Sequence, residues 1–192
     1  FADVQADIAA QLVRAGIELW ISNHRSVEGI LDYVRRLGAL VGAASKADAY
    51  AVELQRGLDA VAAAVPAGPR PRVYFEEWDE PMISGIRWVA ELVRIAGGDD
   101  IFPERAEKSL ARDRILADST EILARAPQII FGSWCGKKFR PELVAARPGW
   151  QDLPAVRDHQ LFEIKSPLIL QPGPAALTDG LRHVRFRGRR AR

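Results

Sequence analysis

The stretch RVYFEEWDEPMISGIRWVAELVRIAGG at residues 72–98 decides the fold, because it predicts a strand, a loop and a helix in succession. Residues 73–75 are β-branched or aromatic and follow a proline, so they favour a short buried strand. Residues 76–80 place four carboxylates around one indole, which are hard to bury, and we expect a loop there. Pro81 and Ser84 then open a helix that ends at Gly97. Loops at the carboxyl ends of strands are the usual ligand positions in open α/β sheets.

The chain after this stretch continues the alternation of strands and helices. A loop is expected at 99–105. Strands are expected at 128–131 and 161–164, helices at 118–126, 141–146 and 175–184, and loops at 132–136 and 166–174. This alternation predicts the α/β class with a largely parallel sheet.

The chain before it predicts a helix from Asp3 to Gly16, a short strand at 17–21, a loop at 22–25 and a helix from Ser26 to Gly38. Residues 45–65 then repeat apolar side chains at helical spacing, and such a helix would be about 30 Å long. It ends at the proline-rich linker 66–71, which no helix can cross. We interpret this break as a domain boundary; a crossover helix within one domain is the alternative.

Composition limits the possible partners. Hydrophobic residues make up 48% of the 192 residues, enough for a core, and the net charge of +2 gives no field that favours nucleic acid. Five arginines gather in the tail 185–192, which indicates a solvated terminus or, alternatively, a polyanion-binding arm. No apolar run is long enough to span a membrane. The start at Phe1, without a signal peptide, predicts a processed form or a fragment.

The acidic loop and the loop after the strand 128–131 carry the candidate chemistry. Glu76 and Glu77 would point to opposite faces of a continued strand, so they suit ligand contacts better than an acid–base pair. Trp78 and Trp134 each follow a strand and could wall a flat apolar ligand, or they could simply belong to the core.

Cys135 is the only cysteine, so no intrachain disulfide can form. We expect a buried, inert thiol rather than a nucleophile, because no histidine lies near it in sequence. His24 could face a cleft or be solvated. A small α/β enzyme that uses Glu77 with Cys135 or His24 is the alternative of another class. No metal or nucleotide motif is present, and no cofactor is expected.

Taken together, these residues resemble the periplasmic substrate-binding proteins of ABC importers, of the cobalamin and iron-chelate type. The likeness is closest to cobalamin-binding members. The matching pieces are RVYFEEWDEPMISGIRWVAELVRIAGGDDIF at 72–102, FGSWCGKKF at 131–139, RPGWQDLPAVRDHQLFEI at 147–164 and SPLILQPGPAALTDGL at 166–181.

The resemblance implies two Rossmann-like α/β lobes joined by the long helix 45–65. Residues 1–44 would be the remainder of an incomplete first lobe, and 72–184 the second lobe. The incomplete lobe would expose a sheet edge through which two copies could pair. The docking glutamate of the family has no clear counterpart in LILQPGP at 168–174.

The resemblance also implies a function without catalysis. The protein would be a periplasmic or lipid-anchored component that binds cobalamin or a related corrinoid between the lobes and passes it to a membrane permease. An iron-siderophore or haem is the alternative ligand. By position, the ligand contacts would be Glu77, Trp78, Met82, Trp134, Cys135, Ser166 and Leu168 in the second lobe, and Asn23, His24 and Arg25 in the first.

Overall fold

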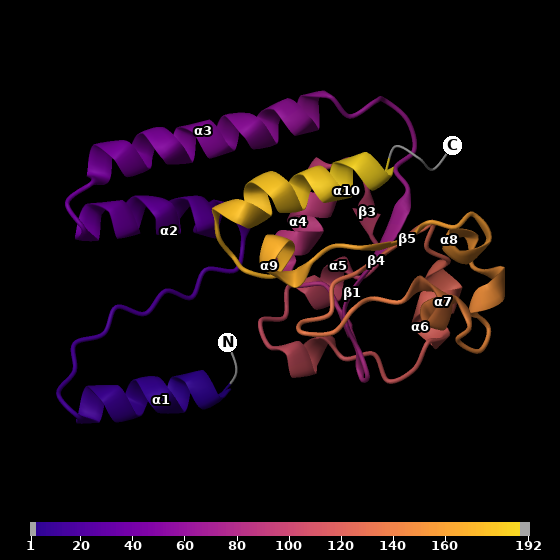
Figure 1. Cartoon of the computed structure of the whole chain (residues 1–192), viewed down its shortest axis with the longest axis horizontal. Helices are drawn as coiled ribbons and strands as arrows, with labels where there is room; N and C mark the ends of the chain where they lie inside the picture. The colour runs from indigo at the N-terminus through magenta and orange to yellow at the C-terminus, as the bar shows by residue number, and fades with distance from the viewer. Residues whose placement is uncertain (1–2, 189–192) are drawn as a thin grey trace.

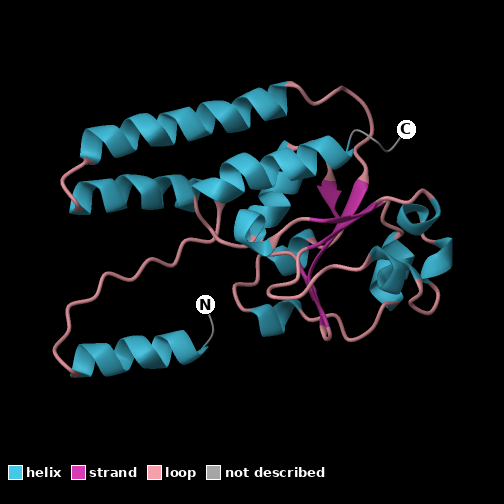
Figure 2. Ribbon diagram, in the orientation of Figure 1, coloured by secondary structure: helices cyan, strands magenta, loops and turns pink. Residues whose placement is uncertain are grey.

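The strand β1 (Arg72–Asp79) lies in the middle of the sheet in the computed structural model, which describes residues 3–188. It pairs in parallel with β4 (Ile129–Gly132) and antiparallel with β2 (Met82–Ser84). The strand β5 (Leu161–Glu163) extends the sheet in parallel beyond β4, and β3 (Asp99–Asp100) pairs in parallel with the beginning of β1. The predicted α/β class and the largely parallel sheet are confirmed (Figure 2).

Alternation along the strands divides the core into two layers. Val73 and Phe75 on β1 and Phe131 on β4 pack into the first layer. Tyr74 and Ile130, which lie one residue away on the same strands, pack into the second. Successive side chains of a strand point to opposite faces, so both faces of this sheet are apolar and both need a cover.

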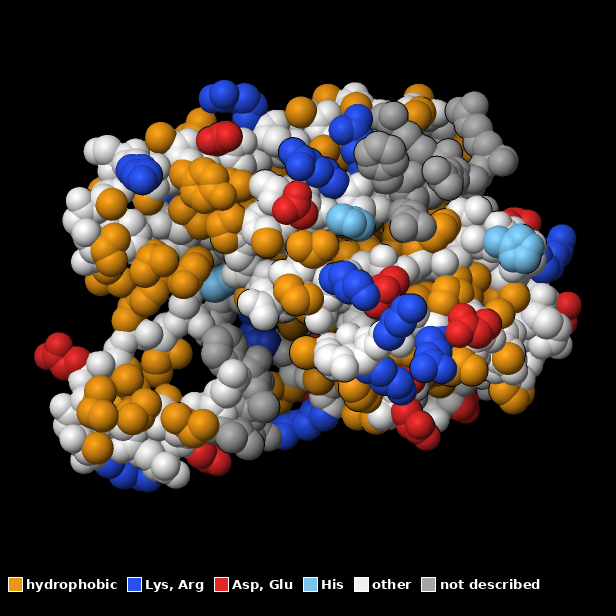
Figure 3. Space-filling model, in the orientation of Figure 1, with side chains coloured by type: hydrophobic (Ala, Val, Ile, Leu, Met, Phe, Trp, Pro, Cys, Tyr) orange, Lys and Arg blue, Asp and Glu red, His pale blue; other side chains and the backbone are white. Residues whose placement is uncertain are grey.

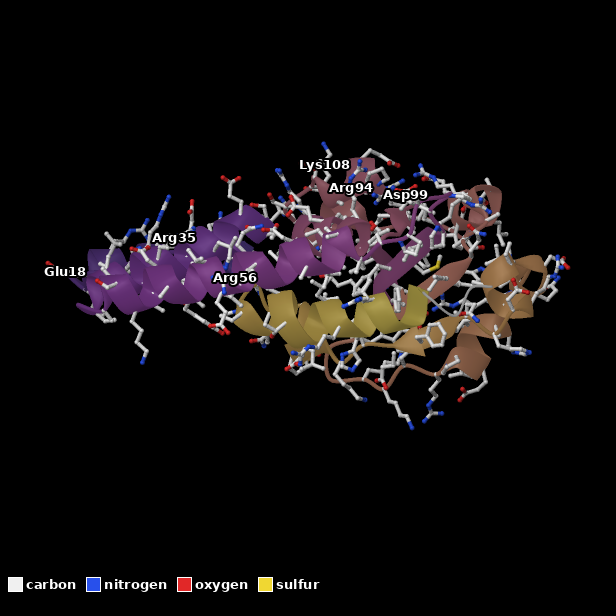
Figure 4. The ribbon with its side chains drawn as sticks, turned by 90° about the horizontal axis from the view of Figure 1, so that it is seen from above. Glu18, Arg35, Arg56, Arg94, Asp99 and Lys108 are labelled. Atoms are coloured by element: carbon white, nitrogen blue, oxygen red, sulfur yellow. The ribbon has the colours of Figure 1, made fainter. Side chains whose placement is uncertain are left out.

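Helices cover both faces (Figure 1). The first layer lies under α3 (Ala44–Ala63), α4 (Arg87–Ile95), η3 (Ala176–Gly180) and α10 (Leu181–Gly188). The second lies under α6 (Thr120–Arg125), α7 (Pro141–Ala145), η2 (Trp150–Asp152) and α8 (Pro154–Arg157). The shorter elements α5 (Pro103–Ala106), η1 (Ala111–Arg114) and α9 (Ser166–Ile169) lie in the connections. Seen from above, α10 runs beside α3 (Figure 4).

The first part of the chain is helical but contributes no strand among the described residues. The helix α2 (Val27–Leu40) begins at Ser26, whose hydroxyl accepts a hydrogen bond from the backbone N–H of Gly29. It packs against α3 so closely at Gly38 that a Cβ there would lie 2.1 Å from the Cβ of Ala47. The helix α1 (Asp3–Arg14) stands apart from this pair (Figure 1).

The predicted strand at 17–21 is wrong. This segment joins α1 to the loop before α2 and forms no ladder with any described strand. Trp20 remains 46% exposed and stacks on Tyr33 of α2, with ring centroids 5.5 Å apart. β-branched and aromatic residues favour a strand only where a neighbouring strand supplies hydrogen bonds and a packing surface.

Other boundaries also differ from the prediction. The long helix is confirmed, at Ala44–Ala63 instead of 45–65. The helix expected to open at Pro81 and Ser84 begins only at Arg87, because residues 82–84 turn back and pair with β1 as β2. The Glu80–Pro81 peptide at the tip of this hairpin is cis. The loops expected at 99–105 and 166–174 contain β3, α5 and α9. The basic tail falls partly in α10, and 189–192 lie outside the described residues.

The prediction of an exposed acidic loop at 76–80 is wrong for Glu76. The strand β1 continues through this residue, which is 0% exposed. The two terminal nitrogens of Arg147 donate to its oxygens at 2.6 and 2.9 Å. Tyr74 and Trp134 donate to it at 3.2 and 3.1 Å. Burial raises the pKa of Glu76, and the hydrogen bonds from these three side chains oppose that shift. A paired and hydrogen-bonded carboxylate can be buried where an isolated one cannot.

We expect Arg147→Ala to lower the free energy of unfolding by about 3–5 kcal/mol, because it leaves the carboxylate of Glu76 buried without its charged partner. Arg182→Ala is the matched control: Arg182 forms an exposed ion pair with Asp179, and its loss should cost at most about 1 kcal/mol. Urea denaturation followed by tryptophan fluorescence measures both. Equal midpoints for the two variants would contradict this account of Glu76.

A second carboxylate, on Asp100, is buried with less support. One of its oxygens accepts the backbone N–H of Phe102 at 2.7 Å, and the other has no hydrogen-bond partner among the described residues. Burial raises the pKa of Asp100 to about 6, against the effect of the Phe102 hydrogen bond. Folding therefore disfavours the ionised form, and Asp100 costs stability as the pH rises from about 4, its unfolded pKa, to about 6.

We expect Asp100→Asn to remove this loss. The variant should gain about 1–3 kcal/mol over the parent at pH 7, and the gain should shrink to roughly a few tenths of a kcal/mol near pH 4, where the parent carboxyl is protonated in the folded state and about half protonated in the unfolded state. Denaturation midpoints of the two proteins between pH 4 and pH 8 test the difference. Parallel pH profiles would show that Asp100 does not titrate in the folded protein as described.

Candidate functional site

A pocket of about 450 Å³ lies beside the carboxyl half of β1, where segments far apart in sequence meet. Its lining comes from α1, the loop before α2, β1, the start of α4, the segment 109–114 and the loop after α9: Gln5, His24, Arg25, Glu77, Ile86, Trp88, Ser109, Leu110, Ala111, Arg112, Arg114, Leu170 and Pro172. The surface of the molecule is hollowed between α1 and α2 (Figure 3).

Glu77 and Arg114 form the buried side of the pocket. The two terminal nitrogens of Arg114 donate to the two oxygens of Glu77 at 2.6 and 3.2 Å. One of them also donates to the backbone carbonyl of Ser84. Only 1% of Arg114 is exposed, and its Nε has no hydrogen-bond partner among the described residues. Glu77 thus points to the face opposite Glu76, as strand alternation predicts, and each carboxylate has its own arginine.

The loop before α2 is held to the rest of the pocket by two long-range hydrogen bonds. One ring nitrogen of His24 donates to the carbonyl of Pro172 at 2.6 Å, while the ring stacks on Tyr33. A terminal nitrogen of Arg25 donates to the carbonyl of Ser109 at 2.5 Å. Burial, with a smaller contribution from the positive charge of Arg114, lowers the pKa of Arg25.

Of the predicted ligand contacts, Glu77, His24 and Arg25 line this pocket. Their role in binding stays a prediction. The other predicted residues lie outside its lining. Asn23 is exposed and accepts a hydrogen bond from Arg25. Trp78 and Met82 are half-buried and pack against the second core layer. Ser166 and Leu168 belong to α9.

Trp134 does not stand as an open wall beside Trp78. It is 5% exposed, donates to Glu76 and packs edge-on against Phe139, with ring centroids 5.0 Å apart. The ammonium group of Lys137 lies 5.8 Å from the ring centroid of Trp78 and 5.1 Å from that of Trp134. Trp134 is therefore a core residue, and its indole N–H serves as a hydrogen-bond donor to the buried carboxylate of Glu76.

The expectation of a buried thiol at Cys135 is wrong, since the residue is exposed in the loop that follows β4. Cys135 lies outside the pocket lining, so the pocket does not bring it to Glu77. The carboxylate of Glu77 is held by Arg114. Within residues 3–188, no three His, Cys, Asp or Glu side chains gather in a way that could hold a metal ion.

Sequence reasoning missed the segment 109–114, which supplies Ser109, Arg112 and Arg114 to the pocket. Its signal in the sequence was weak: Arg114 follows a charged run, and only the apolar neighbours Ile115 and Leu116 indicate a buried stretch. The bridge between Ile83 and Ile115 attaches this segment to β2 and brings Arg114 under β1.

Comparisons with known proteins agree with this architecture. A family model described as periplasmic binding protein matches residues 1–168. A search among curated proteins finds no significant match. None of the helices in the described part of the chain is both long and apolar enough to cross a membrane.

Several solved structures share the fold. An ABC transporter substrate-binding protein from Listeria monocytogenes EGD-e aligns with a TM-score of 0.78 at 18% identity, over 96% of this chain and 73% of that one. The periplasmic vitamin B12 binding protein BtuF of Vibrio cholerae aligns at 0.72 and 21%, over 97% and 70% of the two chains. The periplasmic heme-binding protein RhuT from Roseiflexus sp. RS-1 aligns at 0.72 and 19%, over 94% and 71%.

The family model covers most of the sequence, and these solved structures share the fold of this chain. The chain belongs to the periplasmic binding protein family.

Proposed function

We propose that this protein is the solute-binding component of an ABC importer, that it acts outside the cytoplasmic membrane, and that it passes a metal chelate to a membrane permease without converting it. Family membership supports the transport role. The names of its structural neighbours support the ligand class, because they include a vitamin B12 binder, a heme binder and a component of an Fe³⁺-hydroxamate transport system.

One observation carries the proposal: the pocket is built from both sides of the long helix α3. His24 and Arg25 precede α3 in the chain, whereas Glu77, the segment 109–114 and Pro172 follow it. A solute bound there contacts both parts of the molecule at once. Its volume of about 450 Å³ lies within the range of about 300–1,000 Å³ that is usual for small-molecule pockets.

The resemblance of the sequence puts cobalamin first among the candidate chelates, with haem and ferric siderophores beside it. We expect purified protein to bind at least one of cyanocobalamin, hemin and ferrioxamine with a Kd of about 1 μM or tighter. Isothermal titration and ligand absorbance measure this directly. Failure of all three probes to bind would refute the proposed function.

A blocking variant locates the site. Ala111 is an exposed lining residue, and Ala111→Trp should fill the mouth of the pocket and weaken binding at least tenfold. Ala124, which is exposed on α6 outside the lining, provides the control Ala124→Trp, and binding should be unchanged. Equal losses in the two variants would mean that the chelate binds elsewhere.

A further inference from the structure

We propose that the segment 17–21 (IELWI) pairs with the same segment of a second copy of the chain, as two antiparallel strands, and that this pairing forms a twofold-symmetric dimer. Within the described part of the chain, the segment has no strand to pair with. It lies outside the lining of the pocket, so the proposal goes beyond the proposed function and does not rest on it.

The backbone of this segment offers the groups of a strand without a ladder. It runs extended from α1 to the loop before α2 (Figure 1). The N–H and C=O groups of residues 18–21 form no hydrogen bond with another described residue. A row of unpaired backbone groups at the surface is a template to which another strand can add.

The side chains of the segment give it one apolar side. Trp20 stacks on Tyr33 of α2, so by strand alternation Glu18 and Trp20 face α2. The three odd-numbered residues are all apolar and lie on the opposite side. Among them, Ile17 is 49% exposed and Ile21 is 59% exposed. A second copy would remove this apolar surface from water, which favours association.

The neighbouring helices add apolar surface to the same region. Ile8 and Val13 are exposed on α1, and Leu40 and Val41 are exposed at the end of α2. Hydrophobic side chains gather on both sides of the hollow between α1 and α2 (Figure 3). Two paired strands alone are at best marginally stable in water, so they need a helix to pack against. The helix α1 of each copy supplies that cover.

The order of the residues favours a second copy as the partner and sets the register. When two copies run in opposite directions about Leu19, Ile17 lies opposite Ile21. Glu18 then lies opposite Trp20, so no like charges meet. A parallel pairing in register would place Glu18 beside its own copy, and like charges directly opposite each other destabilise a strand pair. The antiparallel register is the same for both copies, as a twofold axis requires.

Sedimentation velocity tests the dimer with two variants that differ only in the sign of one charge. We expect the parent to pass from monomer to dimer between about 1 and 100 μM. Ile17→Glu with Ile21→Glu places like charges opposite each other at both ends of the pairing. Ile17→Glu with Ile21→Lys places opposite charges there instead, and this variant should dimerise at least about tenfold more tightly than the first. Both positions are exposed, so both variants should fold.

The control carries two added negative charges away from the segment. Ala124→Glu with Leu143→Glu changes exposed residues of α6 and α7, and dimerisation should remain that of the parent. Hydrogen exchange followed by mass spectrometry tests the ladder itself. Amides of residues 18–21 should exchange more slowly at high protein concentration in the parent, and equally fast at all concentrations in the Ile17→Glu, Ile21→Glu variant. Circular dichroism confirms that each variant is folded.

The contrary outcomes are distinct. A parent that stays monomeric at about 100 μM, or that assembles beyond a dimer, would overturn the proposal. Equal dimerisation of the two charge variants would overturn the antiparallel register. Dimers without slower exchange at residues 18–21 would mean that the interface lies elsewhere. Chelate binding is measured separately, so none of these outcomes bears on the proposed function.

Discussion

The structure depends on the buried ion pair between Glu76 and Arg147. It joins the middle of the central strand β1 to the turn before η2, and it is completed by Tyr74 and Trp134. Arg147 also stacks on Trp150, with its guanidinium carbon 4.6 Å from the ring centroid. The second core layer is thus arranged around a charge that only this set of partners makes tolerable in an apolar surrounding.

The next residue along the strand shows how the same chemistry gives a different result on the opposite face. Glu77 also meets an arginine, Arg114, but this pair is at the edge of a pocket instead of the centre of the core. Strand alternation sends the two neighbouring carboxylates to opposite faces, and the surroundings of each face decide its role. Glu76 organises packing, whereas Glu77 positions a cationic group beside a space that a ligand can enter.

The pocket gathers charged side chains from distant parts of the chain. The net charge of the chain is only +2, and the described lining of the pocket includes Arg25, Arg112, Arg114 and Glu77. Arg25 precedes α3 in the chain and Arg114 follows it, so this set of side chains exists only while both parts of the molecule are in place. The overall composition therefore does not show which charged side chains the fold brings to one place.

Local patterns in the sequence determined several elements of this protein. The helical spacing of apolar residues predicted α3, the residues 73–75 and 128–131 predicted β1 and β4, and alternation predicted opposite faces for Glu76 and Glu77. Resemblance to a known family also assigned Glu77, His24 and Arg25, which the structure brings to one pocket. The helix, the strands and their alternation depend on residues close together in the chain. The assignment of Glu77, His24 and Arg25 depends on the resemblance of the whole sequence to the family.

Only the tertiary structure decided the rest, because the partners concerned are distant in sequence. Arg147 lies 71 residues after Glu76. Pro172, whose carbonyl binds His24, lies 148 residues after that histidine. No local pattern shows that a carboxylate will find such a partner, so the sequence predicts a loop at Glu76 and does not indicate a role for Arg114. The segment 17–21 had the composition of a strand and lacked a described strand to pair with. Propensity is local, whereas burial, pairing and charge compensation belong to the folded chain.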